Sequence, residues 1–230
     1  MRARSPEERL AVALDFEELD PALDLTRRLK GLVRTLKIGP RLFVGHGAAA
    51  IAEVRALGFE VFLDMKFHDI PATVGGACRA ASRLGVRYLT VHIAGGEAMM
   101  RAAVEGAREG GGTEPAVLGI TVLTSRAVAN TREVTDLARA GRDAGLRGVV
   151  ASARELPALR RELGDRPLIV TPGIRPAGGD AGDQKRVATP ARAIAAGADL
   201  LVVGRPIYQA ADPRAAAEAI LDEIRAESAG

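Results

Sequence analysis

The sequence predicts a single (β/α)8 barrel that spans residues 1–230, an α/β fold. Short apolar runs recur eight times, roughly 20 to 30 residues apart, which is the length of one strand–helix unit. Most of these runs are apolar throughout rather than alternating, as in parallel strands that are covered on both faces. With 230 residues, of which 47% are hydrophobic, the chain has enough apolar side chains for one barrel core.

The eight predicted strands end in polar residues, glycine or proline. The segments between them, such as 74–85, 135–145 and 189–198, carry Ala, Leu and Arg at helical spacing and stop at or near glycine. An open doubly wound sheet is the alternative fold, but "LDFEELDP" follows the first run where that fold would have G-x-G-x-x-G. In chain order, the strands are "LAVALDF" (10–16), "TLKIG" (35–39), "EVFLDMKF" (60–67), "RYLTVHIAG" (87–95), "AVLGITVLT" (116–124), "RGVVAS" (147–152), "PLIVTPGI" (167–174) and "DLLVVGRPI" (199–207).

Composition excludes several classes of function. The net charge is only +3, the arginines are scattered, and tryptophan is absent with 3% aromatic residues, so we expect no nucleic-acid binding. No apolar run is long enough for a membrane span or a signal peptide, and the single cysteine, Cys78, fits a reducing compartment. We therefore expect a cytoplasmic protein without membrane contact. Three dispersed histidines and one cysteine predict no metal site.

Charged residues gather at the predicted carboxyl ends of the strands, where barrels of this kind hold their active sites. Asp15, Lys37, Asp64 and Lys66 would meet at one mouth of the barrel. Charges of both signs are costly to bury unless they are paired, so their convergence indicates a site. Lysine occurs at only four positions in a chain whose cations are mostly arginine. An ammonium can release a proton and a guanidinium cannot, which makes a lysine such as Lys66 a candidate for chemistry, whereas Lys30 is expected to be an ordinary surface charge.

The motif "DMKFHDIP" (64–71) holds the predicted catalytic pair. On a regular strand, Asp64 and Lys66 point to the same side, whereas Met65 and Phe67 point toward the helices. Lys37 closes the neighbouring strand and can lie against Asp64, which gives an alternating array of lysine and carboxylate. Each carboxylate favours the charged form of the nearby ammonium, so the array would hold a positioned proton donor. The alternative is an ordinary structural salt bridge at a strand end.

The long segment 171–190, rich in glycine, proline and aspartate, predicts a phosphate site. Barrels often bind phosphate with the loops that follow strands seven and eight, where glycine lets backbone N–H groups approach the ligand. Gly204 and Arg205 follow the eighth strand, and Arg205 would supply a bidentate charge. Gln184 and Arg186 could close over the ligand as part of a lid. The alternative is a surface loop without function.

Several motifs together resemble the bacterial orotidine 5'-phosphate decarboxylases, over about residues 10–219. They are "LAVALDF", "LKIGPRLF", "LDMKFHDIPATV", "VHIAGG", "TVLTS", "TPGIR", "DQKRVATPARAI" and "VVGRPI". The continuation H-D-I-P-x-T-V is specific to that family, whereas the shorter D-x-K-x-x-D also occurs in magnesium-dependent sugar-phosphate relatives. Met65 and Phe67 stand where leucine is more usual, both on the outward side.

The resemblance implies a cofactor-independent decarboxylation of orotidine 5'-monophosphate (OMP) to UMP in pyrimidine synthesis. It implies that Lys66 protonates the product carbanion and that the enzyme is a homodimer with shared active sites. Two other functions stay open: a magnesium-dependent sugar-phosphate decarboxylase or aldolase, and a barrel that only binds nucleotides. The implied roles are ribose binding by Asp15 and Lys37, pyrimidine contact by Thr124, phosphate binding by Arg175, Gln184, Gly204 and Arg205, catalysis by Lys37, Asp64, Lys66 and Asp69, and entry into the partner's site by Asp69 and Thr73.

Overall fold

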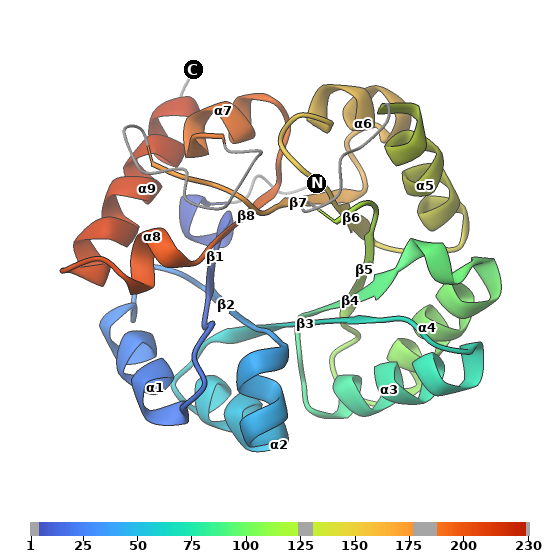
Figure 1. Ribbon diagram of the computed structural model, residues 1–230, viewed down its shortest axis with the longest axis horizontal. Coiled ribbons are helices and arrows are strands. Elements are labelled where there is room, and N and C mark those ends of the chain that lie inside the picture. Colours follow the sequence, from blue (N-terminus) through green and yellow to red (C-terminus); the bar gives the residue numbers. More distant parts are fainter. Residues whose placement is uncertain (1–4, 124–130, 177–187, 229–230) are drawn as a thin grey trace.

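The fold is a closed barrel of eight parallel strands surrounded by helices (Figure 1). The computed structural model describes residues 5–123, 131–176 and 188–228. The strands are β1 (Leu10–Ala13), β2 (Thr35–Ile38), β3 (Glu60–Phe67), β4 (Tyr88–His92), β5 (Ala116–Ile120), β6 (Gly148–Val150), β7 (Leu168–Thr171) and β8 (Leu200–Val203). The α-helices are α1 (Leu19–Arg28), α2 (Pro40–Ala56), α3 (Pro71–Arg83), α4 (Glu97–Glu109), α5 (Thr131–Asp143), α6 (Leu156–Leu163), α7 (Pro190–Ala195), α8 (Arg205–Tyr208) and α9 (Pro213–Ser228), with 3-10 turns at Pro6–Glu8 and Ile93–Gly95.

Sequential pairing of the strands confirms the predicted barrel. Each strand pairs in parallel with the next one in the chain, and β8 pairs with β1 through partners such as Val12 and Val203. This closure excludes the open doubly wound sheet. Each predicted run contains one strand, but most of the strands are shorter than predicted. The runs had included the polar residues that follow the strands, and these begin the loops that build the site.

Two apolar layers hold the barrel together. The outer layer lies between strands and helices and consists mainly of leucine, isoleucine, valine and alanine. The inner layer fills the barrel, where Phe62 and Tyr88 pack edge to face with their ring centroids 5.7 Å apart. Small residues, Ala11, Ala13 and Ala116, complete much of this inner layer. Because alanine fills less space than the branched residues usual in barrel interiors, room remains at both ends of the barrel.

Short connections place functional side chains directly at the strand ends. Helix α2 begins at Pro40, two residues after β2, and α8 begins at Arg205, two residues after β8. Proline suits the first turn of a helix because its missing N–H would have no partner there. Such connections leave little freedom at the carboxyl ends of the strands, so the side chains there are fixed by the barrel.

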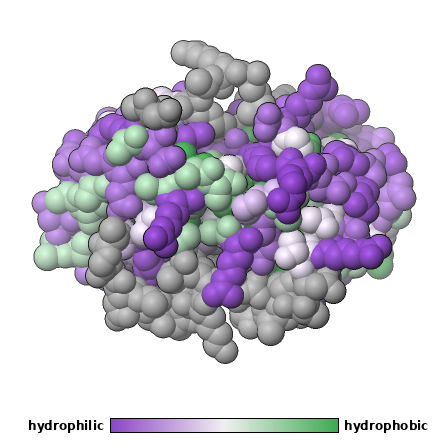
Figure 2. All heavy atoms as spheres, turned by 90° about the horizontal axis from the view of Figure 1, so that it is seen from above, coloured by the Kyte–Doolittle hydropathy of each residue, from purple (hydrophilic) through white to green (hydrophobic). Residues whose placement is uncertain are grey.

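One face of the molecule is predominantly polar. The face in Figure 2 is mostly hydrophilic, with smaller hydrophobic areas between the charged side chains. Among the residues that the structure describes, no helix combines the length and the apolar character needed to cross a membrane.

Candidate active site

A cavity of about 270 Å³ opens at the carboxyl ends of the strands. Its walls combine charged residues at the strand ends with apolar residues of the barrel interior, such as Phe62, Val150 and Val202. The predicted site residues that line it are Asp15, Lys37, Asp64, Lys66, Arg175, Gly204 and Arg205. The structure therefore brings together residues from β1, β2, β3, β7 and β8, as the strand-end argument predicted.

Lys37 links two carboxylates across the mouth of the barrel. Its ammonium Nζ lies 3.3 Å from Asp15 Oδ1 and 3.6 Å from Asp64 Oδ2. Lys37 belongs to β2, and Asp15 follows β1, so parallel pairing of Ala13 with Lys37 brings the two residues together. The Lys37 side chain is only 11% exposed, and two anionic neighbours compensate for its loss of water.

Asp64 lies at the centre of the array. Lys66 Nζ donates a hydrogen bond of 2.7 Å to Asp64 Oδ2, and the Thr90 hydroxyl donates one of 2.9 Å to Oδ1. Burial by itself would raise the pKa of the Asp64 carboxyl, but the charges of Lys37 and Lys66 and these hydrogen bonds outweigh it and lower the pKa. Asp64 is thus an anion at neutral pH, and it can hold two ammonium groups in fixed positions.

Lys66 does not lie on a regular strand. It is the only described residue other than glycine with a positive φ, +52°, and its backbone N–H donates to Thr90 Oγ1 at 2.9 Å. Leu63 pairs with Leu89 and Phe67 with Val91, so four steps along β3 match two along β4. The predicted meeting of Lys66 with Asp64 is confirmed, but the strand is not regular there, because a bulge lies between Leu63 and Phe67.

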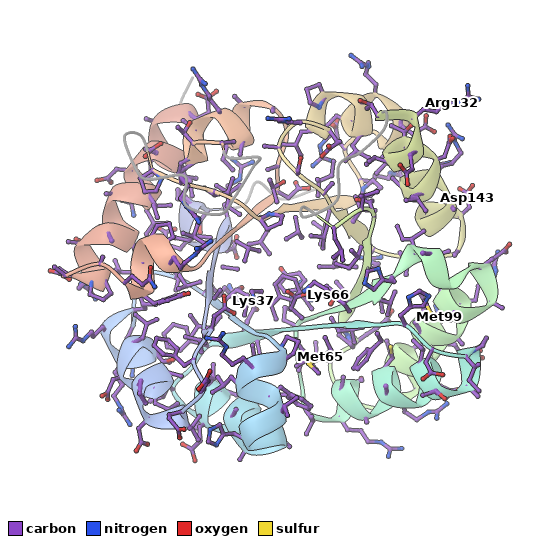
Figure 3. All side chains as sticks on the ribbon, viewed as in Figure 1. Lys37, Met65, Lys66, Met99, Arg132 and Asp143 are labelled. Carbon is purple, nitrogen blue, oxygen red and sulfur yellow. The ribbon has the colours of Figure 1, made fainter. Side chains whose placement is uncertain are left out.

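Met65 and Phe67 face the helices, as predicted. Both pack against the outer apolar layer. Figure 3 shows Lys37 and Lys66 within the ring of strands and Met65 outside it. The motif 64–67 therefore divides into two charged residues that line the cavity and two apolar residues that anchor the strand.

The residues predicted to bind phosphate lie on the side of the cavity where β7 and β8 end. Ile174 and Ala188 form an isolated parallel bridge, and the Arg175 backbone N–H donates to the Ala188 carbonyl at 3.0 Å. This bridge closes the base of the long segment after β7, and Arg175 lies at that base. At Gly204, an added Cβ would lie 3.3 Å from the Tyr208 ring and 3.5 Å from Asp15 Oδ2, so glycine fits this close approach best. Thr124, Gln184 and Arg186 lie outside the described residues.

Asp69 and Thr73 do not line the cavity of their own chain. Both are exposed, and Asp69 Oδ1 accepts a hydrogen bond from the Ile70 backbone N–H at 2.6 Å. Ile70 itself is an exposed large apolar residue. Of the predicted catalytic residues, Lys37, Asp64 and Lys66 line the cavity and Asp69 does not.

Two histidines, His68 and His92, lie close to each other near the end of β4. The rings of His68 and His92 are 5.3 Å apart. Burial lowers the pKa of His92, repulsion from His68 and Lys66 lowers it further, and Asp64 raises it in part. His92 is therefore neutral at physiological pH.

Over residues 5–123, 131–176 and 188–228, no group of three or more His, Cys, Asp or Glu residues could hold a metal ion.

Thr90 is a site residue that the sequence analysis missed. It is fully buried on β4 and contacts both Asp64 and Lys66 through its hydroxyl. An indication was available, since Thr90 alternates with Tyr88 and His92 on a strand that is otherwise apolar at its centre. Tyr208, which also lines the cavity and packs against Phe16 at 5.4 Å, was missed as well.

The closed barrel and its cavity of paired lysines and carboxylates define a (β/α)8-barrel enzyme. The chain belongs to the family described as "Orotidine 5'-phosphate decarboxylase / HUMPS family", which it matches over residues 8–220. A protein from Nitratidesulfovibrio vulgaris (strain DP4) named orotidine 5'-phosphate decarboxylase is 48% identical over 229 residues, covering 94% of this chain and 97% of that protein. One of the same name from Halorhodospira halophila (strain DSM 244 / SL1) is 48% identical over 228 residues, covering 95% and 96%.

A solved structure has the same fold. The crystal structure of orotidine 5'-phosphate decarboxylase from Lactobacillus acidophilus superposes with a TM-score of 0.83 at 35% sequence identity. The superposition covers 94% of this chain and 99% of that one. The likeness therefore covers nearly the whole chain.

Proposed function

We propose that this chain decarboxylates orotidine 5'-monophosphate to UMP, a step of pyrimidine biosynthesis, without a metal or other cofactor. The observation that carries the proposal is the array of Lys37, Asp64 and Lys66 in a cavity that also contains Arg175 and Arg205. The names of the relatives support the same reaction. The substrate needs a site that binds a phosphate on one side and places an ammonium beside the pyrimidine on the other.

Substrate binding would use both sides of the cavity. Asp15 and Lys37 would bind the ribose hydroxyls, since a carboxylate accepts and an ammonium donates hydrogen bonds. Arg175 and Arg205 would bind the phosphate together with the backbone at Gly204, because guanidinium groups match phosphate oxygens in bidentate geometry. Outside the described residues, Gln184 would bridge phosphate and base, and Thr124 would contact the pyrimidine.

The chemistry would be electrostatic. The bond between C6 and the carboxylate breaks, CO2 leaves, and the electron pair stays at C6 in an orbital orthogonal to the ring π-system. A charged ammonium beside C6 stabilises that pair and then transfers a proton to it. Lys66 is suited to this role because Asp64 holds its Nζ at 2.7 Å. Solvent would return the proton to Lys66 after each turnover.

A homodimer with shared active sites would complete the catalytic set. Asp69 and Thr73 lie outside the cavity of their own chain and are exposed, which supports their entry into the site of a partner subunit. Asp69 of the partner would then be the second carboxylate beside Lys66. We propose that residues 1–230 form one catalytic domain, that the protein is cytoplasmic, and that it binds neither nucleic acid nor membranes.

One assay tests the proposed function against both alternatives. Loss of orotate absorbance is followed with OMP as substrate in the presence of EDTA. Turnover at full rate in EDTA is the expected result. Turnover only after magnesium is restored would support the sugar-phosphate type of enzyme instead. Binding of UMP without any turnover would indicate a barrel that only binds nucleotides.

A further inference from the structure

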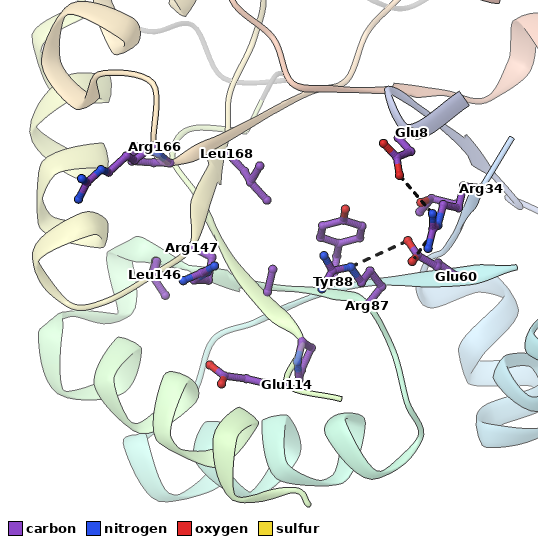
Figure 4. A pocket seen from close by; sticks show the side chains of 14 residues that line it. Glu8, Arg34, Glu60, Arg87, Tyr88, Glu114, Leu146, Arg147, Arg166 and Leu168 are labelled. Atoms are coloured by element: carbon purple, nitrogen blue, oxygen red, sulfur yellow. Dashed lines mark hydrogen bonds and ion pairs between the residues drawn. The ribbon is translucent and has the colours of Figure 1, made fainter. Parts of the chain in front are cut away.

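We propose a second ligand site, at the amino ends of the strands, that binds a small molecule bearing a phosphate or carboxylate group. A cavity of about 840 Å³ opens there, at the end of the barrel opposite the active site (Figure 4). Small-molecule sites typically occupy roughly 300 to 1,000 Å³, so this cavity could hold a molecule as large as a mononucleotide. Its walls come from the residues that begin or precede β2 to β7, and from Glu8.

The hydroxyl of Tyr88 is the feature that points to a ligand. Tyr88 is only 4% exposed, and its side chain rises into the cavity in Figure 4. Within the described part of the chain, its ring packs against Phe62 and lies under Arg87, but its hydroxyl has no hydrogen-bond partner. The hydroxyl is open to the cavity rather than enclosed in the core, so a molecule that enters the cavity can reach it. An acceptor on a bound ligand would satisfy it.

Of the four arginines that line the cavity, two lie in ion pairs with glutamates, and the other two have no such pair within the described part of the chain. Arg34 binds Glu8 at 3.1 Å and Glu60 at 3.0 Å, and Arg87 lies 3.9 Å from Glu60. These pairs neutralise the two glutamates on that side. On this side of the cavity, both glutamates are therefore paired with arginine and repel an anionic ligand less.

Arg147 and Arg166 are the other two arginines. They precede β6 and β7 on the other side of Tyr88 (Figure 4), and neither has an ion-pair partner among the described residues. Glu114 lies on the same rim, so this side carries two arginines and one acid. Both side chains are exposed, and that of Arg166 extends away from Tyr88 in Figure 4, so these arginines would turn inward to bind a phosphate or carboxylate. The Tyr88 hydroxyl would donate to the same ligand.

The amino-end cavity is separate from the active site. Phe62 lies between them: it lines the active-site cavity, is 1% exposed, and packs on Tyr88. No lining residue is common to the two cavities. A ligand at the amino end would therefore bind independently of the substrate phosphate.

Fluorine NMR can observe the two cavities separately. The chain has only two tyrosines, Tyr88 and Tyr208, and each lines one cavity. Labelling with 3-fluorotyrosine gives two resonances, which the variant Tyr208→Phe assigns. The probes are pyrophosphate and citrate, titrated to millimolar concentration. We expect the Tyr88 resonance to shift saturably with at least one of them. A response to pyrophosphate alone assigns a phosphate ligand, and a response to citrate alone assigns a carboxylate.

Matched variants test which arginines bind the probe. In Arg147→Ala with Arg166→Ala, the Tyr88 shift should need about tenfold more ligand, or more, because charge-assisted hydrogen bonds are lost. In Arg28→Ala with Arg161→Ala, which removes two exposed arginines elsewhere, the titration should not change. The proposal is overturned if only the Tyr208 resonance responds, if neither responds, or if the Tyr88 response is the same in both double variants.

Discussion

Lys66 holds its ammonium 2.7 Å from the carboxylate of Asp64 with a backbone φ of +52°. For a residue with a Cβ atom, this left-handed conformation costs roughly 1 to 2 kcal/mol. Two hydrogen bonds compensate, one from the Lys66 side chain to Asp64 and one from its backbone N–H to Thr90. The strain therefore lies at the residue to which we assign the proton transfer.

Replacement of Lys66 should separate activity from stability. We expect Lys66→Ala to lower kcat by at least ~10³-fold, since both the proton donor and its charge are lost. Affinity for UMP and the folded structure should be largely retained, because the side chain lies at the rim of the barrel. Orotate absorbance measures the rate, and calorimetry with UMP measures binding. Appreciable residual turnover would show that Lys66 is not the donor.

The backbone strain predicts a second property of this position. Lys66→Gly should have an unfolding free energy roughly 1 kcal/mol higher than Lys66→Ala, because glycine adopts a positive φ without steric cost. At Glu53, exposed in α2, the order should reverse, since glycine is less favourable than alanine in a helix by about 1 kcal/mol. Urea unfolding of the four variants measures both differences. The same order at both positions would contradict the strain at Lys66.

The sequence was sufficient to predict the barrel and most of one active-site wall. Apolar runs mark strands because burial on both faces excludes polar residues, and the residues that close those runs include Asp15, Lys37 and Asp64. The bulge at Lys66 was not predictable, because its conformation depends on pairing with β4. Thr90 resembled an ordinary strand residue until its distance from Asp64 was known. The amino-end cavity was not predictable, because its walls come from residues that begin or precede six different strands and form no sequence motif.

Thr90 should support the site through its hydroxyl. Thr90→Val leaves the buried backbone N–H of Lys66 without an acceptor and removes a donor to Asp64. We expect an unfolding free energy lower by roughly 1 to 3 kcal/mol, and a kcat lower by roughly 10- to 100-fold as Lys66 loses its position. Denaturant unfolding and steady-state kinetics measure the two effects.

Thr171 provides the matched control for Thr90. It is also a fully buried strand threonine, but its hydroxyl has no hydrogen-bond partner among the residues described. Thr171→Val should therefore raise the unfolding free energy by about 1 kcal/mol, because an unsatisfied hydroxyl is removed. If Thr90→Val and Thr171→Val change stability equally, the hydroxyl of Thr90 has no special role.

Asp64 should make stability depend on pH in the acid range. Its folded pKa is lowered from the ordinary value of 3.8, so the unfolded state binds more protons in this range. The contribution of Asp64 is thus fully present above that value and is lost as pH falls through the folded pKa. Asp64→Asn should lose less unfolding free energy than the wild type as pH falls below 3.8. In the control Asp165→Asn, which removes an exposed carboxylate, the unfolding free energy should depend on pH as in the wild type. If the unfolding free energy of Asp64→Asn also falls in parallel with that of the wild type, the pKa of Asp64 is not lowered by folding.

Mixing inactive subunits tests whether the active sites are shared. If Asp69 enters the site of the partner subunit, a hybrid of Lys66→Ala and Asp69→Ala chains has one site with both groups intact. Random reassociation of equal amounts should then restore about a quarter of the wild-type activity, since half of the dimers are hybrids with one working site each. The control mixes Lys66→Ala with Asp64→Ala. These two residues form their ion pair within one chain, so no hybrid site is complete and no activity should return. Equal recovery in both mixtures, or none in the first after subunit exchange is demonstrated, would place Asp69 outside the partner's site.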